Sequence, residues 1–479
     1  MIRAVALALC LCAATVDAAV PRAITRAFLD AGVPMSSVAI VVAPTGAGAP
    51  LFTHQATRPM TPASVMKLVT TFAALEVLGR DYRFRTDAYL DGKLHDGTLD
   101  GNLVLKGHGD PKITIEQWQA FVADLRARGL AEIRGDLVLD RNDFALPPYD
   151  PAAFDGEPRK PYNVGADALL VNFKAVKFAF APNAAGTGVD VTMEPALPNV
   201  ALGSALTLDT SAPCDDWRGG LGAAFIDRGT TAAARFDGRY PADCGVREWY
   251  VALLDHPHYV QGIFTATFDA AGGRFAGAVR EGRAPAHTAA FATLESPPLY
   301  DIVRDVNKLS NNVMASELFL ALAAHTAPLP ATYVKAAAAV KRWLAKAKMP
   351  MPELSIRNGS GLSRTDRISA RSLARLLAAA DASPARDEFA SSLAVAAMDG
   401  TVERRFRNGD VAGQALLKTG SLEGVRALAG YVIDAAGQRF IVVAIVNDPH
   451  AARAQPALDS VVQWTYDNAA AAMAARGGR

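Results

Sequence analysis

Predicted strands stand near both ends of this chain, and their placement limits the folds that it can adopt. The five strands are residues 37–44 and 50–55 near the start, and 414–422, 428–435 and 440–447 near the end. Helical spacing flanks the two groups, over 21–32 and 458–474. The simplest assembly is an α+β fold, in which one antiparallel sheet with helices on both faces takes strands from both ends.

The middle of the chain has a different character. From residue 83 to about 297 it consists mainly of short strands with one clear helix over 115–129, and turns are predicted at Asp91-Gly92, Asp96-Gly97 and Asp100-Gly101. Helical spacing returns over 298–308, 312–325, 332–347 and 369–383. Because loop tips tolerate insertions, we expect a domain of residues 20–82 plus 298–479. It would carry residues 83–297 as a β-rich insertion of two small domains.

Residues 1–19 have the pattern of a secretory signal peptide. Arg3 precedes an apolar stretch over 4–14, and Val16-Asp17-Ala18 offers a small-x-Ala cleavage pattern. The stretch is too short to span a membrane, which takes about 20 apolar residues. A buried helix and a lipid anchor on a cysteine of this segment are the weaker alternatives. We expect a secreted, periplasmic protein without a transmembrane anchor, and peripheral association with the membrane or wall stays open.

Cysteines and charge narrow the function classes. Cys10 and Cys12 would leave with the signal peptide, so the exported chain keeps Cys214 and Cys244. This pair predicts one disulfide, with two free thiols as the alternative. Lys and Arg total 49 against 48 Asp and Glu, so no basic excess indicates nucleic-acid binding. His256-Pro257-His258 lies in a predicted loop without a third ligand, and we expect neither a metal nor a cofactor.

Ser64 and Lys67 form an S-x-x-K motif at the start of a predicted helix over 64–79, for which Thr61 is the expected N-cap. Side chains three residues apart share one helix face. A serine hydroxyl is a poor nucleophile until a nearby base takes its proton. The pair therefore suits nucleophilic catalysis, although the isolated motif is more often a surface lysine beside a capping-region serine.

A second motif, S-x-N, places Ser310 and Asn312 between two predicted helices. The hydroxyl can relay a proton and the amide can hold a substrate carbonyl, but a helix cap would need the same residue types. A third motif, Lys418-Thr419-Gly420-Ser421, lies in a predicted edge strand, where its two hydroxyls alternate to one face. With the lysine they can hold a carboxylate, although alone the motif is more often a solvated strand edge.

The order S-x-x-K, S-x-N, K-T-G is the set found in β-lactamases and penicillin-binding proteins. With these motifs the chain resembles the low-molecular-mass class C penicillin-binding proteins, the D-alanyl-D-alanine carboxypeptidase/endopeptidases. The long insertion between the first two motifs is similar to that of this family. Residues 358–363 (NGSGLS) and 107–111 (GHGDP) resemble its N/D-G-S-G-L-S and G-x-G-D-P segments.

The resemblance implies the serine penicillin-recognising fold, with peptidoglycan peptides and β-lactams as partners, and it leaves the oligomeric state open. The implied roles are nucleophile for Ser64, general base for Lys67, proton shuttle for Ser310, and substrate-carbonyl binding for Asn312. In the third motif, Lys418 supplies positive potential while Thr419 and Ser421 bind the terminal carboxylate. The backbone N–H groups of Ser64 and Ser421 would form the oxyanion hole.

Two alternatives remain beside a carboxypeptidase or endopeptidase. One is a β-lactamase of the same fold, which usually needs a dedicated water-activating residue. No E-x-x-L-N pattern lies between Ser310 and Lys418 to supply one. The other is a non-catalytic cell-wall scaffold, against which the three intact motifs argue.

Overall fold

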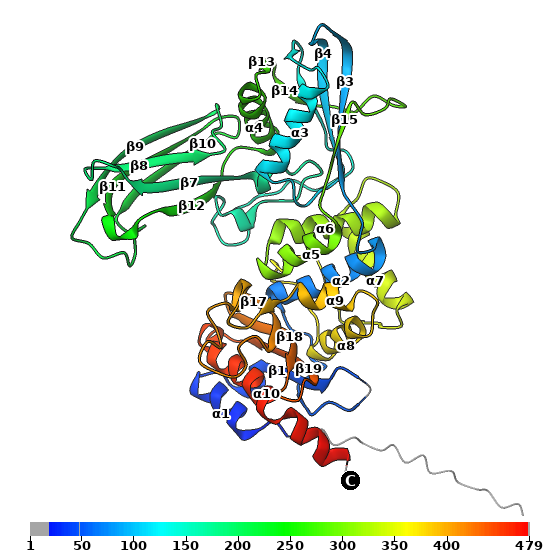
Figure 1. The fold of residues 1–479 in the computed structure, drawn as a ribbon. Helices are drawn as coiled ribbons and strands as arrows, with labels where there is room; N and C mark the ends of the chain where they lie inside the picture. Colours follow the sequence, from blue (N-terminus) through cyan, green and yellow to red (C-terminus); the bar gives the residue numbers. More distant parts are fainter. Residues whose placement is uncertain (1–18, 47, 478–479) are drawn as a thin grey trace, which may run out of the picture. The chain divides into compact units, whose positions relative to one another are not determined.

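The computed structural model describes residues 19–46 and 48–477 (Figure 1). The predicted signal peptide therefore lies outside the described residues, apart from Ala19. No helix within the described ranges is long and apolar enough to cross a membrane. The contacts divide the chain into two compact units. The first unit comprises residues 1–62, 367–382 and 395–479, and the second comprises residues 63–366 and 383–394.

The first unit is built on a six-stranded sheet with the order β16-β17-β18-β19-β1-β2. Its strands are β1 (Val38–Pro44), β2 (Phe52–His54), β16 (Ala394–Val395), β17 (Ala415–Leu422), β18 (Val425–Ile433) and β19 (Arg439–Asn447). Strand β1 pairs with β19 antiparallel along its whole length, from Val38 opposite Val446 to Pro44 opposite Phe440. The expected sheet with strands from both ends of the chain is therefore confirmed.

Helices cover both faces of this sheet, as expected. They are α1 (Arg22–Asp30), α8 (Ala370–Asp381) and α10 (Gln455–Gly477). The ring of Phe52 on β2 meets Trp464 of α10 edge-on at 5.0 Å, and Tyr431 on β18 donates a hydrogen bond to the Leu377 carbonyl of α8. The register aligns Phe52 with Gly430, the neighbour of Tyr431. Because neighbouring residues of a strand point to opposite faces, α8 and α10 lie on opposite sides.

The second unit contains a group of packed helices and the β-rich segment. The helices of the group are α2 (Lys67–Leu78), α5 (Leu299–Lys308), α6 (Asn312–Thr326), α7 (Tyr333–Lys346) and α9 (Arg386–Ser391). Helix α2 packs directly against the other four helices. Nearly all residues of α6 are buried, so α6 forms the centre of this group.

The β-rich segment holds three sheets and two helices. One sheet has the order β13-β5-β4-β3-β15, with β6 also paired to β4 and β14 paired to β6, and two three-stranded sheets have the orders β10-β11-β9 and β12-β7-β8. The elements are β3 (Arg85–His95), β4 (Thr98–Gly107), α3 (Ile115–Ala127), β5 (Glu132–Ile133), β6 (Leu137–Asp140), β7 (Ala175–Pro182), β8 (Val189–Glu194), β9 (Val200–Asp209), β10 (Leu221–Asp227), β11 (Ala232–Pro241), β12 (Arg247–Ala252), α4 (His256–Ala270), β13 (Arg274–Phe275), β14 (Val279–Glu281) and β15 (Ala292–Glu295). The expected disulfide between Cys214 and Cys244 is present.

Two expectations for this segment are wrong. Residues 256–258 were expected in a loop, but they form the first turn of a second helix, α4, whose N-cap Asp255 accepts a hydrogen bond from the His258 amide. Of the three predicted Asp-Gly turns, only Asp96-Gly97 joins two strands. Gly92 and Gly101 instead lie opposite each other inside β3 and β4. A Cβ atom on either glycine would come within 2.3 Å of the facing backbone, so the two glycines permit a close approach of the strands.

The contact-based units do not follow the expected domains. They group helices α2, α5, α6, α7 and α9 with the β-rich segment rather than with the sheet of the first unit. The division into a domain of residues 20–82 plus 298–479 and an insertion of residues 83–297 stays a prediction.

Candidate active site

Ser64 lies in a 3-10 turn, Ala63–Met66, and not in the α-helix itself. Helix α2 begins at Lys67, and Met66 rather than Thr61 takes the N-cap position, so the predicted cap is wrong. In a 3-10 turn, side chains three residues apart eclipse each other. The turn therefore brings the side chain of Lys67 directly over that of Ser64.

Lys67 is the centre of a hydrogen-bond cluster in the second unit. Its side chain is fully buried. The Nζ atom donates to Ser64 Oγ at 3.0 Å, to Asn312 Oδ1 at 2.6 Å, and to the Ser360 carbonyl at 2.7 Å. A lysine amine is thus held against a partly exposed serine hydroxyl by an amide and a carbonyl.

The second motif lies at the start of α6. Asn311 caps this helix by accepting a hydrogen bond from the Met314 amide at 3.1 Å, so Asn312 is not needed for capping. Ser310 has a φ of +57°, a left-handed conformation that non-glycine residues rarely adopt and that concentrates at functional sites. The chain turns sharply here, directly before the residue whose amide oxygen accepts from Lys67.

The amide of Asn312 is fixed from two sides. Its oxygen accepts from Lys67, and its nitrogen donates to the Tyr162 carbonyl at 3.1 Å. A side-chain amide carries two N–H donors. Because the Tyr162 carbonyl accounts for one of them, the second can bind a substrate carbonyl.

No chemical role was predicted for residues 358–363 beyond shaping the cleft, and the contact of this segment with Lys67 was missed. Besides the Ser360 carbonyl bound to Lys67, the Gly359 carbonyl accepts from Thr70 Oγ1 at 2.6 Å. A Cβ atom on Gly361 would lie 1.9 Å from the Ala63 carbonyl oxygen. The two glycines around Ser360 were the available signal, because glycine marks places where another backbone comes close.

The third motif belongs to the first unit. It lies on β17, where Lys418 pairs with Ala429 and Ser421 with Arg426 of β18. The strand is next to the edge, because only the two-residue β16 lies outside it. Lys418 is fully buried, and burial lowers its pKa to about 7. Thr419 Oγ1 donates to Thr401 Oγ1 at 2.8 Å, and Ser421 is exposed.

Two of the contacts between the helices of the second unit and its β-rich segment involve α6. Glu317, fully buried on α6, accepts a hydrogen bond from the Asp167 amide at 2.7 Å, and burial holds the pKa of its carboxyl well above the usual range. The Tyr162 carbonyl bonded to Asn312 is the second contact. Residues 162–167 therefore reach from the second motif into the β-rich segment.

The family model and two of the most similar relatives are all described as D-alanyl-D-alanine carboxypeptidases. The model of the D-Ala-D-Ala carboxypeptidase 3 (S13) family matches residues 21–467. The D-alanyl-D-alanine carboxypeptidase of Actinomadura sp. is 28% identical over 457 residues, which cover 92% of this chain and 83% of that protein. The D-alanyl-D-alanine carboxypeptidase DacB of Haemophilus influenzae is 26% identical over 399 residues, which cover 81% of this chain and 80% of the relative.

Solved structures show the same fold. Penicillin binding protein 4 of Haemophilus influenzae has a TM-score of 0.73 at 22% identity, with 92% of this chain and 99% of that chain covered. A predatory peptidoglycan endopeptidase of Bdellovibrio bacteriovorus has a TM-score of 0.50 at 17% identity, with 90% and 92% covered. Since the family model spans nearly the whole chain, the protein belongs to the D-Ala-D-Ala carboxypeptidase 3 family of serine peptidases.

Proposed function

We propose that this protein is a serine D-Ala-D-Ala carboxypeptidase that also cleaves D-alanyl cross-links of peptidoglycan, through an acyl-enzyme on Ser64. The observation that carries the proposal is the hydrogen bond of 3.0 Å between Lys67 Nζ and Ser64 Oγ. A buried amine beside a serine hydroxyl is the arrangement that activates a weak nucleophile. The family to which the chain belongs is named for the carboxypeptidase reaction.

In the first step, Ser64 Oγ attacks the carbonyl carbon of the penultimate D-alanine, and its proton passes to the neutral amine of Lys67. The tetrahedral intermediate then expels the terminal D-alanine, whose amine receives that proton from Lys67 through Ser310. Water hydrolyses the ester and restores Ser64. In the endopeptidase reaction the leaving amine belongs to a cross-linked stem peptide, so the bond chemistry is unchanged.

The remaining motif residues orient the substrate. The second N–H of Asn312 binds the substrate's peptide carbonyl, while its oxygen keeps Lys67 in place. Lys418, Thr419 and Ser421 bind the terminal carboxylate, with the lysine as the cation. The backbone N–H groups of Ser64 and Ser421 stabilise the oxyanion, and one such donor is typically worth about 3–4 kcal/mol. A β-lactam acylates Ser64 by the same route.

We place this reaction in the periplasm. The support is the predicted signal peptide at 1–19 together with the chemistry of the substrate, because peptidoglycan lies outside the cytoplasm.

Labelling with a fluorescent penicillin tests the nucleophile. We expect the wild type and Ser391→Ala, a change at an exposed serine, to be labelled, and Ser64→Ala to remain unlabelled while it keeps the wild-type thermal unfolding. Equal labelling of Ser64→Ala would show that another residue is acylated.

Mass spectrometry of purified muropeptides tests the substrate. After incubation with the wild type, uncross-linked pentapeptides should lose one alanine and cross-linked dimers should become monomers, whereas Ser64→Ala should leave both unchanged. Rapid turnover of penicillin without any change in either muropeptide would favour a β-lactamase instead.

A further inference from the structure

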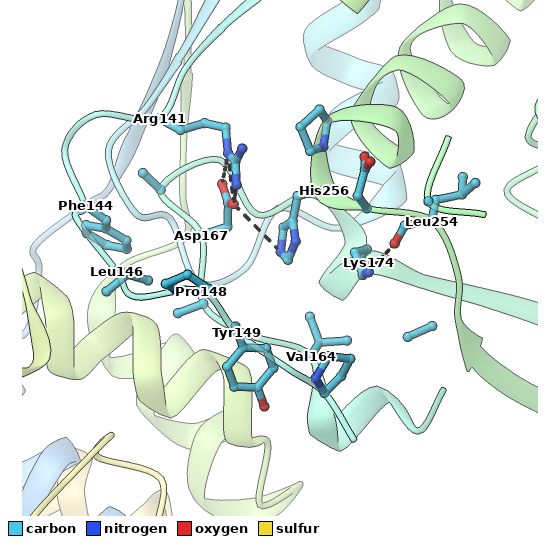
Figure 2. Close-up of a pocket in the computed structure, with 18 of the residues that line it drawn as sticks. Arg141, Phe144, Leu146, Pro148, Tyr149, Val164, Asp167, Lys174, Leu254 and His256 are labelled. Atoms are coloured by element: carbon cyan, nitrogen blue, oxygen red, sulfur yellow. Dashed lines mark hydrogen bonds and ion pairs between the residues drawn. The ribbon is translucent and has the colours of Figure 1, made fainter. Parts of the chain in front are cut away.

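A cavity in the β-rich part of the second unit has no role in the chemistry proposed above. Its volume is about 1350 Å³, and Tyr333 of α7 is among its lining residues. Figure 2 shows Pro148 and Tyr149 along one wall and Lys174 and His256 along the other. Binding pockets for small ligands usually have about 300–1,000 Å³, so this cavity has room for several residues of a peptide. Ser64, Lys67, Ser310 and Asn312 are not among its lining residues.

One cation and two carboxylates of the wall form ion pairs with one another. Arg141 Nε donates to both carboxylate oxygens of Asp167 at 2.9 Å, and its Nη1 donates to Glu281 at 2.6 Å. The ring of His256 lies 4.0 Å from Asp167. Burial lowers the pKa of His256 to about 4, so the imidazole is neutral at pH 7 and adds no charge.

Lys174 is a cation of the wall without such an ion pair, and Arg159 and Arg283, which also line the cavity, are exposed. Its Nζ donates to the Leu254 carbonyl, and no carboxylate of the described chain lies within ion-pair distance of it. Asp227 and Asp255 lie nearby, but Asp227 accepts from the Leu254 amide and Asp255 caps α4. An ammonium can donate three hydrogen bonds, and a partly buried cation without an ionic partner is costly. The cavity thus presents a cation that no carboxylate contacts directly, although Asp167, Asp227 and Asp255 lie near it.

The backbone at Lys174 and at the neighbouring Leu254 has a strained, left-handed conformation. Asn172, Phe173 and Lys174 have φ values of 46°, 53° and 49°, and Leu254 has a φ of 67°. Left-handed backbone is unfavourable for a non-glycine residue because Cβ comes too close to the following carbonyl oxygen. The turn is held because Asn172 Nδ2 donates to the Ala175 carbonyl and to Tyr259 Oη, each at 3.0 Å. Strain of this kind concentrates at ligand and active sites.

We propose that this cavity is a second, non-catalytic binding site for a carboxylate-bearing peptide, with Lys174 as the anchor of the carboxylate and the Pro148-Tyr149 segment as the apolar wall. The ammonium supplies the charge and the remaining donors that a carboxylate needs. Peptidoglycan stem peptides are carboxylate-bearing, so the proposal rests on the proposed function and names a second place at which the protein holds that class of substrate.

Ligand-detected NMR titration tests the site. The probe is Nα-acetyl-L-lysyl-D-alanine, which has no D-Ala-D-Ala bond to hydrolyse, and its C-terminal amide is the control for the carboxylate. In the Ser64→Ala background we expect saturable binding of the acid, at least tenfold weaker binding of the amide, and at least tenfold weaker binding of the acid to Lys174→Met. Lys177→Met, a matched change at a lysine outside the cavity that pairs with Glu194, should bind as the parent does.

Lys174→Gln serves as a second variant, because it removes the charge but keeps a donor for the Leu254 carbonyl. Both neutral variants should keep the parent's thermal unfolding. Three results would each overturn the proposal. The Lys174 variants could bind the acid as tightly as the parent does. The parent could also bind the amide, or inorganic phosphate, as tightly as it binds the acid. Binding should also persist after penicillin acylates the wild type. If penicillin fails to acylate, the proposed function fails, while the comparison of Lys174 and Lys177 variants still decides the cavity.

Discussion

Lys67 combines full burial with hydrogen bonds to three oxygen atoms, from Ser64, Asn312 and Ser360. These contacts fix the direction of the amine, and burial makes its charged form costly. The same surroundings therefore hold the amine against Ser64 Oγ. A substitution that keeps the positive charge but cannot release a proton shows whether Lys67 acts through its charge alone or by accepting the proton of Ser64.

Lys67→Arg is that substitution. A guanidinium stays protonated in proteins, so it cannot accept the proton of Ser64, and loss of a general base typically costs a factor of about 10²–10⁴. We expect the rate of acylation by penicillin to fall by about that factor, measured by stopped-flow fluorescence, while the circular dichroism spectrum is retained. Lys346→Arg at the exposed end of α7 is the control. Comparable rates in the two variants would remove Lys67 from the proton transfer.

The raised pKa of His108 makes the stability of the fold depend on pH. This residue lies in the segment that resembles the family's G-x-G-D-P turn. Burial alone would lower its pKa, but hydrogen bonds to Asp143 at 2.6 Å and Asp87 at 3.2 Å raise the pKa to about 9. The charged form therefore stabilises the fold fully below the unfolded pKa of about 6.5. This contribution is lost as the pH rises through about 9.

We expect the free energy of urea unfolding of the wild type to fall relative to His108→Gln between pH 6.5 and 9.5, by up to about 3 kcal/mol at 1.4 kcal/mol per pKa unit. The control is His325→Gln at an exposed position, for which the difference in unfolding free energy from the wild type should stay constant over this pH range. A constant difference between the wild type and His108→Gln over this range would contradict the shift.

At the scale of elements, the close approach of residues 358–361 to the turn that carries Ser64 gives a matched pair of variants. Gly361 and Gly437 have nearly the same φ, +78° and +79°. A Cβ atom on Gly361 would meet the Ala63 carbonyl at 1.9 Å, whereas nothing lies within 4 Å of one on Gly437. Both glycine-to-alanine changes therefore introduce the same backbone strain, and only one displaces the catalytic turn.

We expect Gly361→Ala to slow penicillin acylation about 10²-fold, because a displacement of about 1 Å at a reacting group can cost that much. Gly437→Ala should lose a similar amount of thermal stability but acylate at the wild-type rate. If both variants acylated normally, the contact with Ala63 would not position Ser64.

The elements also show what the sequence could predict. Long apolar segments such as α6 and β19 were assigned correctly, because each is a largely apolar run that is buried along most of its length. The Asp-Gly pairs inside β3 and β4 were mistaken for turns, because glycine is also found where two strands come too close together for a side chain. Helix α4 was missed although Asp255 and Pro257 are start signals, an N-cap and a proline in the first turn. The Ser360 contact could not be predicted, because it joins segments 293 residues apart.

At the scale of the molecule, the β-rich segment and the helices that carry Ser64 and Asn312 share one compact unit. Two hydrogen bonds help to join these parts: the Asp167 amide donates to Glu317, and Asn312 donates to the Tyr162 carbonyl. No local pattern in the sequence could predict this, because each bond links residues 150 positions apart. A consequence is that both parts should unfold together.

The disulfide between Cys214 and Cys244 tests this cooperativity, because it closes a loop of 30 residues in the β-rich segment. A cross-link of that length stabilises by about 3–4 kcal/mol in the chain-entropy model. The double variant Cys214→Ser, Cys244→Ser should acylate at the wild-type rate at 25 °C, since neither cysteine belongs to the cluster around Lys67. On heating, circular dichroism and penicillin binding should be lost together, at a lower temperature than in the wild type. Penicillin binding that outlasted the loss of strand signal would mean that the helices keep their active-site geometry without the β-rich segment.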